Sequence, residues 1–274
     1  MDGQDAWEKQ QLETTATTRP DPVVRTIRFS DIADSLAAGM RDFRAAPLFG
    51  LTFGGLYALG GILIVSTVAA LKMPYFTYPL ASGFVLIGPL VAIGLYEVSR
   101  LIERGETVTW GAIFKAIWSQ AGKEIGWMCF VVLFITTMWL YQVRLLLALF
   151  LRDETMTSMG EFFTVVTSTS QGWLFLGVGH VIGAILSTIL FSLTVVSFPI
   201  LLDRSIDFIT AMITSVRAVA KNPQPMLIWA AIIVATLFVS ALPMFLGLIV
   251  VLPVLGHTTW HLYRKLVEPE KPAA

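Results

Sequence analysis

The three histidines are the side chains of this sequence best suited to acid–base or metal chemistry, because imidazole titrates near neutral pH and binds transition metals. His257 and His261 are four residues apart, so they share one face of a helix and could hold one metal ion. His180 lies in another apolar stretch. Because no HExxH pattern or carboxylate cluster accompanies them, we expect hydrogen-bonded histidines, with a metal or proton site as the alternative.

Two methionines and two charged residues complete the candidates. Met156 and Met159 have the M-x-x-M spacing that places two thioether sulfurs on one helical turn, where they could bind Cu(I) or simply fill space. Arg144 stands within an apolar run, and we expect its side chain to extend to the lipid headgroups, with pairing or pore lining as the alternative. Glu97 is an acidic residue in a second apolar segment and could line a pathway or form an ion pair.

Motifs for catalysis are missing from the sequence. It has no phosphate-binding loop, no GxGxxG, no GxSxG and no pair of carboxylates within an apolar segment. The lone cysteine, Cys129, can form neither an intramolecular disulfide nor a thiolate metal cage. Nineteen basic residues balance nineteen acidic ones, which argues against nucleic acid as a partner. We therefore expect no enzyme activity, no catalytic residues and no cofactor.

The composition is that of an integral membrane protein. Hydrophobic residues make up 55% of the 274 residues and charged ones only 14%, more apolar surface than one soluble core can bury. Segments of ~20 apolar residues cross a bilayer as helices. The predicted fold is an all-α bundle of six transmembrane helices, at residues 47–71, 77–98, 126–151, 172–199, 226–242 and 244–262.

The last two segments meet at residues 241–243, and Pro243 breaks the helical pattern there. One unbroken helix over both segments would be longer than any bilayer is thick. We therefore expect a tight helical hairpin, with one long, broken helix as the alternative.

Basic residues predict the orientation. All Lys and Arg residues except Lys72, Arg144 and Arg152 fall at the two chain ends or in the connections after the second and fourth spans. The positive-inside rule then places both termini in the cytoplasm. Residues 1–24 are polar and are predicted to be a disordered tail, residues 25–268 a single membrane domain, and residues 269–274 a second short tail.

An amphipathic segment before the first span is predicted to be an elbow helix, lying along the membrane surface and ending at Pro47. A similar segment ends at Pro223 before the fifth span. The second and sixth spans also align without a gap, which pairs Pro89 with Pro253 and would kink both helices at matching depths. With a weaker third copy ahead of the third span, these segments predict internal repeats of one elbow and two spans.

Small residues are the strongest packing signal within the spans. Gly50 with Gly54 and Gly179 with Gly183 have the GxxxG spacing that lets two helices approach closely. We expect them to pack helices within the chain or between copies in a homo-oligomer. Pro89 and Pro253 have packing kinks as one interpretation and a broken-helix binding site as the other.

The stretch from TIRFSDIADSLAAGMRDFRAAP to GPLVAIGLYEVSRLIERGE resembles the bacterial integral-membrane family catalogued as domain of unknown function 2189, over residues ~25–265. The resemblance implies a multi-pass protein of the bacterial inner membrane. Some relatives are labelled putative cytochrome c oxidase subunits, which implies respiratory-complex subunits as partners. A haem–copper core needs about six histidine ligands, and this chain has three histidines, so such a role would be accessory.

Two functions follow as expectations. The first is a non-catalytic membrane protein that acts through helix and lipid contacts, as an accessory or assembly factor of a respiratory oxidase. The alternative is a small-solute or ion transporter or channel, which rests on the two intramembrane prolines, the hydroxyl-rich fourth span, and Glu97, His257 and His261.

Overall fold

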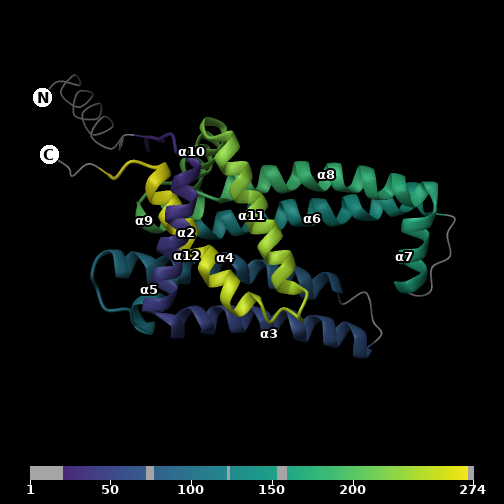
Figure 1. Ribbon diagram of the computed structural model, residues 1–274, viewed down its shortest axis with the longest axis horizontal. Helices are drawn as coiled ribbons and strands as arrows, with labels where there is room; N and C mark the ends of the chain where they lie inside the picture. Colours follow the sequence, from purple (N-terminus) through teal and green to yellow (C-terminus); the bar gives the residue numbers. More distant parts are fainter. Residues whose placement is uncertain (1–20, 72–76, 122–123, 153–158, 271–274) are drawn as a thin grey trace, which may run out of the picture.

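The computed structural model describes residues 21–71, 77–121, 124–152 and 159–270, and the regular secondary structure in these ranges is helical apart from one antiparallel bridge between Val24 and Val267. Figure 1 shows the helices, with the first and last described residues, 21 and 270, at the same end of the bundle. In chain order they are α2 (Phe29–Ala45), α3 (Pro47–Leu71), α4 (Thr77–Glu103), α5 (Trp110–Ala121), α6 (Glu124–Phe150), α7 (Met159–Ser168), α8 (Ser170–Thr194), α9 (Ser197–Asp203), α10 (Phe208–Lys221), α11 (Pro223–Ala241) and α12 (Leu248–Leu266).

Four stretches of the described residues are long and apolar enough to cross a membrane. They lie in α3, in α6, in α8 together with α9, and in α11, at Pro47–Thr67, Glu124–Phe150, Ser170–Asp203 and Pro223–Ala241. Four of the six predicted spans therefore have a matching helix of sufficient length and apolarity, and the protein is an all-helical membrane protein with several spans.

The second and sixth predicted spans correspond to α4 and α12, which are not among these four. Both helices become polar toward their C-terminal ends, where α4 carries Glu97, Arg100 and Glu103, and α12 ends in the sequence HTTWHLYRKL. Six spans thus stay a prediction. The fourth span is also interrupted, because α8 ends at Thr194 and the backbone N–H of Val196 donates to Ser215 Oγ of α10 at 3.1 Å.

Proline ends two of the short amphipathic helices at matching joints. Ala46, before Pro47, has φ −135° and ψ 55°, and Asn222, before Pro223, has φ −127° and ψ 53°. A residue that precedes proline is kept out of the helical region, and proline itself suits the first turn of the next helix. The predicted breaks at Pro47 and Pro223 are confirmed.

A six-residue turn separates α11 from α12, so the predicted helical hairpin is confirmed and the single long helix is excluded. Met244 and Phe245 have φ values of 52° and 63°, in the left-handed region that no helix can continue through. The backbone N–H of Gly247 donates to the carbonyl of Ser240 at 3.1 Å and closes the turn.

Helix α12 lies at the centre of the packing, against α2, α3, α4 and α11. Two glycines allow its neighbours to come close. A Cβ atom at Gly39 of α2 would lie 2.6 Å from the backbone nitrogen of Thr258, and one at Gly54 of α3 would lie 2.4 Å from the carbonyl oxygen of Ile249. By contrast, α8 packs mainly on α6, α7, α9 and α10, so α6 and α8 form a two-helix arm beside the rest of the bundle (Figure 1).

We predict that Gly54→Ala lowers the free energy of unfolding by about 1–3 kcal/mol, because the added methyl group collides with the backbone of α12, which cannot move aside cheaply. Gly55→Ala is the matched control, since a Cβ atom there meets nothing within 4 Å. Thermal unfolding of the purified protein in mild detergent measures both. Equal unfolding temperatures for the two variants would contradict the close packing of α3 on α12.

Candidate functional site: a polar junction at one end of the bundle

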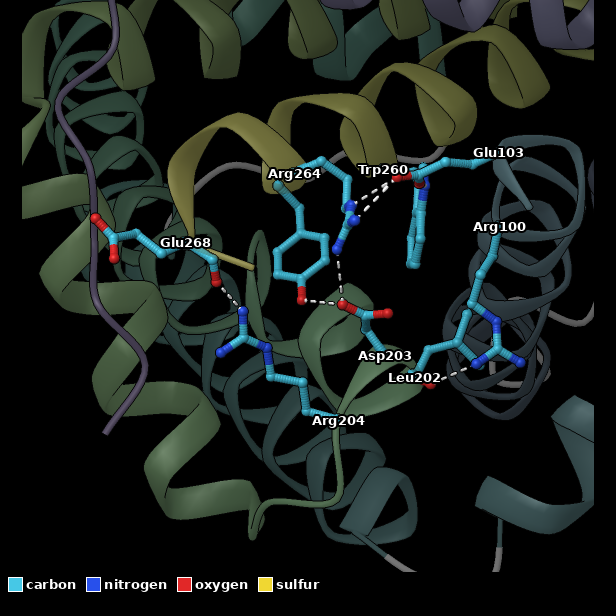
Figure 2. Close-up of polar contacts among 9 residues, drawn as sticks. Arg100, Glu103, Leu202, Asp203, Arg204, Trp260, Arg264 and Glu268 are labelled. Carbon is cyan, nitrogen blue, oxygen red and sulfur yellow. Dashed lines mark hydrogen bonds and ion pairs between the residues drawn. The ribbon is translucent and has the colours of Figure 1, made fainter. Parts of the chain in front are cut away.

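Charged side chains converge where the C-terminal ends of α4, α9 and α12 meet α2. Figure 2 shows the part of this region that joins α4, α9 and α12. We call it the polar junction, and its members are Asp31, Asp34, Asp42, Glu97, Ser99, Arg100, Glu103, Asp203, Arg204, His257, Trp260, His261, Tyr263, Arg264, Lys265 and Glu268.

Three arginines tie the helix ends to one another in a ring. Arg100 of α4 donates to the carbonyl of Leu202 in α9 at 3.2 Å, and Arg204, directly after α9, donates to the carbonyl of Glu268, after α12. Arg264 of α12 returns to α4 through Glu103 at 2.9 Å (Figure 2). Carbonyls at helix C-termini have no partner within their own helix, and their partial negative charge attracts cations.

Asp203, at the end of α9, is an acceptor shared by two side chains of α12. It accepts a hydrogen bond from the Tyr263 hydroxyl at 2.7 Å and pairs with Arg264 at 3.2 Å, while its side chain is only 14% exposed. Glu103 accepts from Arg264 and also from the indole N–H of Trp260 at 3.0 Å. A carboxylate this poorly hydrated is stable only with such partners, so Asp203 holds α12 on α9.

Glu97 is buried, but its charge is balanced within its own helix. Arg100 donates from Nε at 2.7 Å and from Nη2 at 3.0 Å to the two carboxylate oxygens of Glu97, one turn away. This forked geometry is the strongest that arginine and a carboxylate form. Of the two roles considered for Glu97, the structure places it in an ion pair.

Helix α2 supplies carboxylates to the other side of α12. Lys265 lies 2.9 Å from Asp31 and 3.0 Å from Asp34, and His261 Nε2 lies 2.7 Å from Asp42. The backbone N–H of Arg28 donates to Asp31 at the start of α2 and, with the hydrogen bond from Lys265, holds the pKa of that carboxyl below its usual value. The carboxylates of α2, paired with Lys265 and His261 of α12, therefore fix the packing of the two helices.

The two neighbouring histidines are held in separate hydrogen bonds. His257 is fully buried, with its Nδ1 2.8 Å from the Ser99 hydroxyl of α4, and its Nε2 has no hydrogen-bond partner among the described residues. His261 turns to Asp42 of α2. The described part of the chain holds no group of three or more His, Cys, Asp or Glu side chains suited to a metal ion. The hydrogen-bonded arrangement is the one observed.

The remaining sequence candidates lie outside the polar junction. Pro253 is buried next to Gly50, where a Cβ atom would lie 3.2 Å from its ring, and Pro89 borders a cavity of about 210 Å³ between α4, α6, α8 and α9. Arg144 is exposed on α6. Met156 and the side chain of Met159 lie outside the described residues.

A third group of candidates lies on the arm. His180, Gly179 and Gly183 of α8 line a groove against α6, together with Gln142. His180 Nδ1 lies 2.7 Å from the carbonyl of Leu176, one turn earlier. His180 and His257 thus belong to different parts of the molecule.

Sequence reasoning missed Glu103, Asp203, Arg204 and Tyr263. Their partners are up to 161 residues away in the chain, so no local spacing reveals them. One signal was available, because the alignment of the second and sixth spans pairs Arg100 with Arg264, and both prove to be members of the junction.

Comparison with protein families adds one match, which covers α4 through α9. Residues 77–203 match the family described as "Predicted integral membrane protein (DUF2189)". The resemblance to DUF2189 is confirmed over this stretch, which includes Glu97, Arg100, Glu103 and Asp203 of the polar junction. The elbow motif at residues 26–47 lies outside the DUF2189 match. Neither the curated proteins nor the solved structures gave a match to this chain.

We predict that Arg264→Met lowers the free energy of unfolding by about 1–3 kcal/mol, because Asp203, whose side chain is only 14% exposed, keeps its burial and loses its cation. The matched control is Arg217→Met, since Arg217 pairs with Asp21 where the two side chains are 56% and 72% exposed. Thermal unfolding in mild detergent is the measurement. If both variants unfold with the wild type, the junction does not stabilise the bundle.

Proposed function

We propose that the protein crosses the bilayer six times, in three copies of an elbow helix followed by two spans. The copies are α2–α3–α4, α5–α6–α8/α9 and α10–α11–α12. Their contacts support this division, because each elbow packs on the second span of the preceding copy: α5 on α4, α10 on α8 and α9, and α2 on α12. The order is cyclic, and so is the ring of Arg100, Arg204 and Arg264 that ties the three second spans together.

The end of the bundle with the polar junction faces the cytoplasm in this proposal, and the membrane is the bacterial inner membrane. The basic residues of the connections after α4 and α9 and of both chain ends support that orientation. The three elbows lie at this end (Figure 1), where the proposal puts the lipid headgroups.

Single cysteines test the topology. In a Cys129→Ser background, we expect a membrane-impermeant maleimide to label Arg152→Cys in intact spheroplasts, and to label Glu106→Cys and Glu270→Cys only after the membrane is opened. Six spans place residues 106 and 270 on the same side. If α4 and α12 do not cross, these two residues lie on opposite sides, and labelling of only one of them in intact spheroplasts would refute six spans.

The protein's function is non-catalytic in this proposal: it acts through helix and lipid contacts, as an accessory or assembly factor beside a respiratory oxidase. One observation carries the argument. Each carboxylate of the polar junction has a basic partner, and Arg204 donates to the carbonyl of Glu268, so these groups hold helices together rather than standing free for a reaction. Arg204 Nε and His257 Nε2 are the buried polar atoms of the junction without a hydrogen-bond partner among the described residues. The oxidase link rests on the labels of relatives in the resembled family.

The alternative is transport of a small solute or ion. A cavity of about 170 Å³ between α3, α4, α11 and α12 is lined by Tyr57, Tyr96 and Thr259, among mostly apolar residues. It lies between the two proline-containing helices and near the buried His257–Ser99 pair. Polar side chains inside a bundle, next to helices that proline can bend, are consistent with a substrate site of an alternating-access carrier.

Purification separates the two functions. We expect the tagged protein, isolated from its native membrane in mild detergent, to bring down respiratory subunits in stoichiometric amount by mass spectrometry. Arg264→Met is the matched variant, because it weakens the polar junction. If this variant captures fewer respiratory subunits than the wild type, partner binding depends on the folded junction. Isolation of the chain alone, combined with saturable solute flux in proteoliposomes above that of empty vesicles, would contradict the accessory role and favour transport.

A further inference from the structure

A groove of about 410 Å³ runs between α6 and α8 on the two-helix arm. Its walls include the rings of Trp139 and Phe175, the side chain of Leu146, and the small residue Gly183. This volume is within the range of pockets that bind small molecules. None of the residues that line it is charged, and its two strongest hydrogen-bonding side chains are Gln142 and His180.

His180 offers a hydrogen-bond acceptor to the groove. Its Nδ1 lies 2.7 Å from the carbonyl of Leu176, and because a carbonyl only accepts, Nδ1 carries the proton. The neutral ring then has a lone pair on Nε2. Gln142, which has both an amide donor and an amide acceptor, is the second polar group of the lining.

The depth of these two side chains restricts the ligand. His180 is ten residues into α8, which begins at Ser170, and Gln142 is eight residues before the end of α6 at Phe150. At ~1.5 Å per residue these positions are ~15 Å and ~12 Å from the outer helix ends, near the middle of a hydrocarbon core ~30 Å thick. A charged phospholipid headgroup is too costly to place at that depth.

We infer that the groove binds an uncharged membrane amphiphile whose hydroxyl group donates to Nε2 of His180, with its apolar part against the wall formed by Gly179 and Gly183. Trp139 and Phe175 favour a flat ring as the headgroup, of the kind found in a quinol, because aromatic rings pack on one another by offset or edge contacts. An aliphatic alcohol such as a diacylglycerol has the same hydroxyl chemistry without the ring.

A helix from a second copy is the competing occupant, because Gly179 and Gly183 have GxxxG spacing. Such a helix needs a flat seam along the small residues. Here the small residues form one wall of a hollow between two helices, and two bulky rings contribute to its lining. The shape therefore favours a small molecule.

The test uses the full-length protein in mild detergent and three probes. Decylubiquinol has a ring with hydroxyl groups, its oxidised form decylubiquinone has the ring without them, and dioctanoylglycerol has a hydroxyl group without a ring. Binding is measured as the concentration-dependent rise of the unfolding temperature, which a ligand specific for the folded state must produce. We expect saturable binding of decylubiquinol, at least tenfold weaker in Gly183→Leu, which fills the groove, and in His180→Phe, which removes the acceptor. Decylubiquinone, which has no hydroxyl group, should bind at least tenfold more weakly than decylubiquinol and be indifferent to His180→Phe.

Gly177→Leu is the matched control. It lies on the same helix, and a Cβ atom at Gly177 or at Gly183 meets nothing within 4 Å, but only Gly183 lines the groove. Binding of dioctanoylglycerol alone, with the same variant pattern, supports the hydroxyl contact and assigns an aliphatic headgroup. Absence of saturable binding, or equal weakening by Gly177→Leu and Gly183→Leu, overturns the inference. A wild-type dimer that Gly183→Leu dissociates, with no probe bound, also overturns the inference, because a second copy would then occupy the groove. Because the isolated chain is used, the result is independent of partner capture.

Discussion

The packing of α12 depends on the requirement that charges near a membrane core find partners. Transfer of a carboxylate or guanidinium group out of water costs several kcal/mol unless an opposite charge or a set of hydrogen bonds compensates. Arg264 is compensated by α4 and α9, Lys265 by α2, and Asp42 by His261. Each of these pairs joins two helices that are distant in the chain. The charged groups therefore find their partners only when the bundle assembles. The apolar helices supply the spans, and the charged ends determine which helix stands beside which.

Much of the fold could be predicted from sequence because its signals are local. Apolar runs place most helices within a few residues of their observed ends, and Pro47 and Pro223 mark two joints because proline restricts the residue before it. The break between α8 and α9 was missed, since the same apolar run continues through Val195 and Val196. That break depends on Ser215, a residue of a later helix, and contacts of this kind leave no trace in hydropathy.

The candidate residues were easier to name than to connect. His257 and His261 were paired because they are four residues apart. In the structure each has its own partner on another helix, Ser99 of α4 for His257 and Asp42 of α2 for His261. Asp203 went unnoticed, although it accepts hydrogen bonds from both Tyr263 and Arg264. His180 belongs to the arm, where it lines a groove between α6 and α8. The molecule therefore separates a charged, cross-linked end from an apolar arm.

The contact between α2 and α12 also constrains the order of synthesis and assembly. Helix α2 leaves the ribosome well before its partner helix, because Asp31 precedes Lys265 by 234 residues. Until then Gly39 lacks the backbone of α12 on which it packs, and Asp42 lacks its partner His261. Contacts between distant parts of a chain form slowly and leave intermediates exposed. A nascent chain that stalls before α12 would therefore leave α2 without the helix on which it mainly packs, and so available to insertion or quality-control factors.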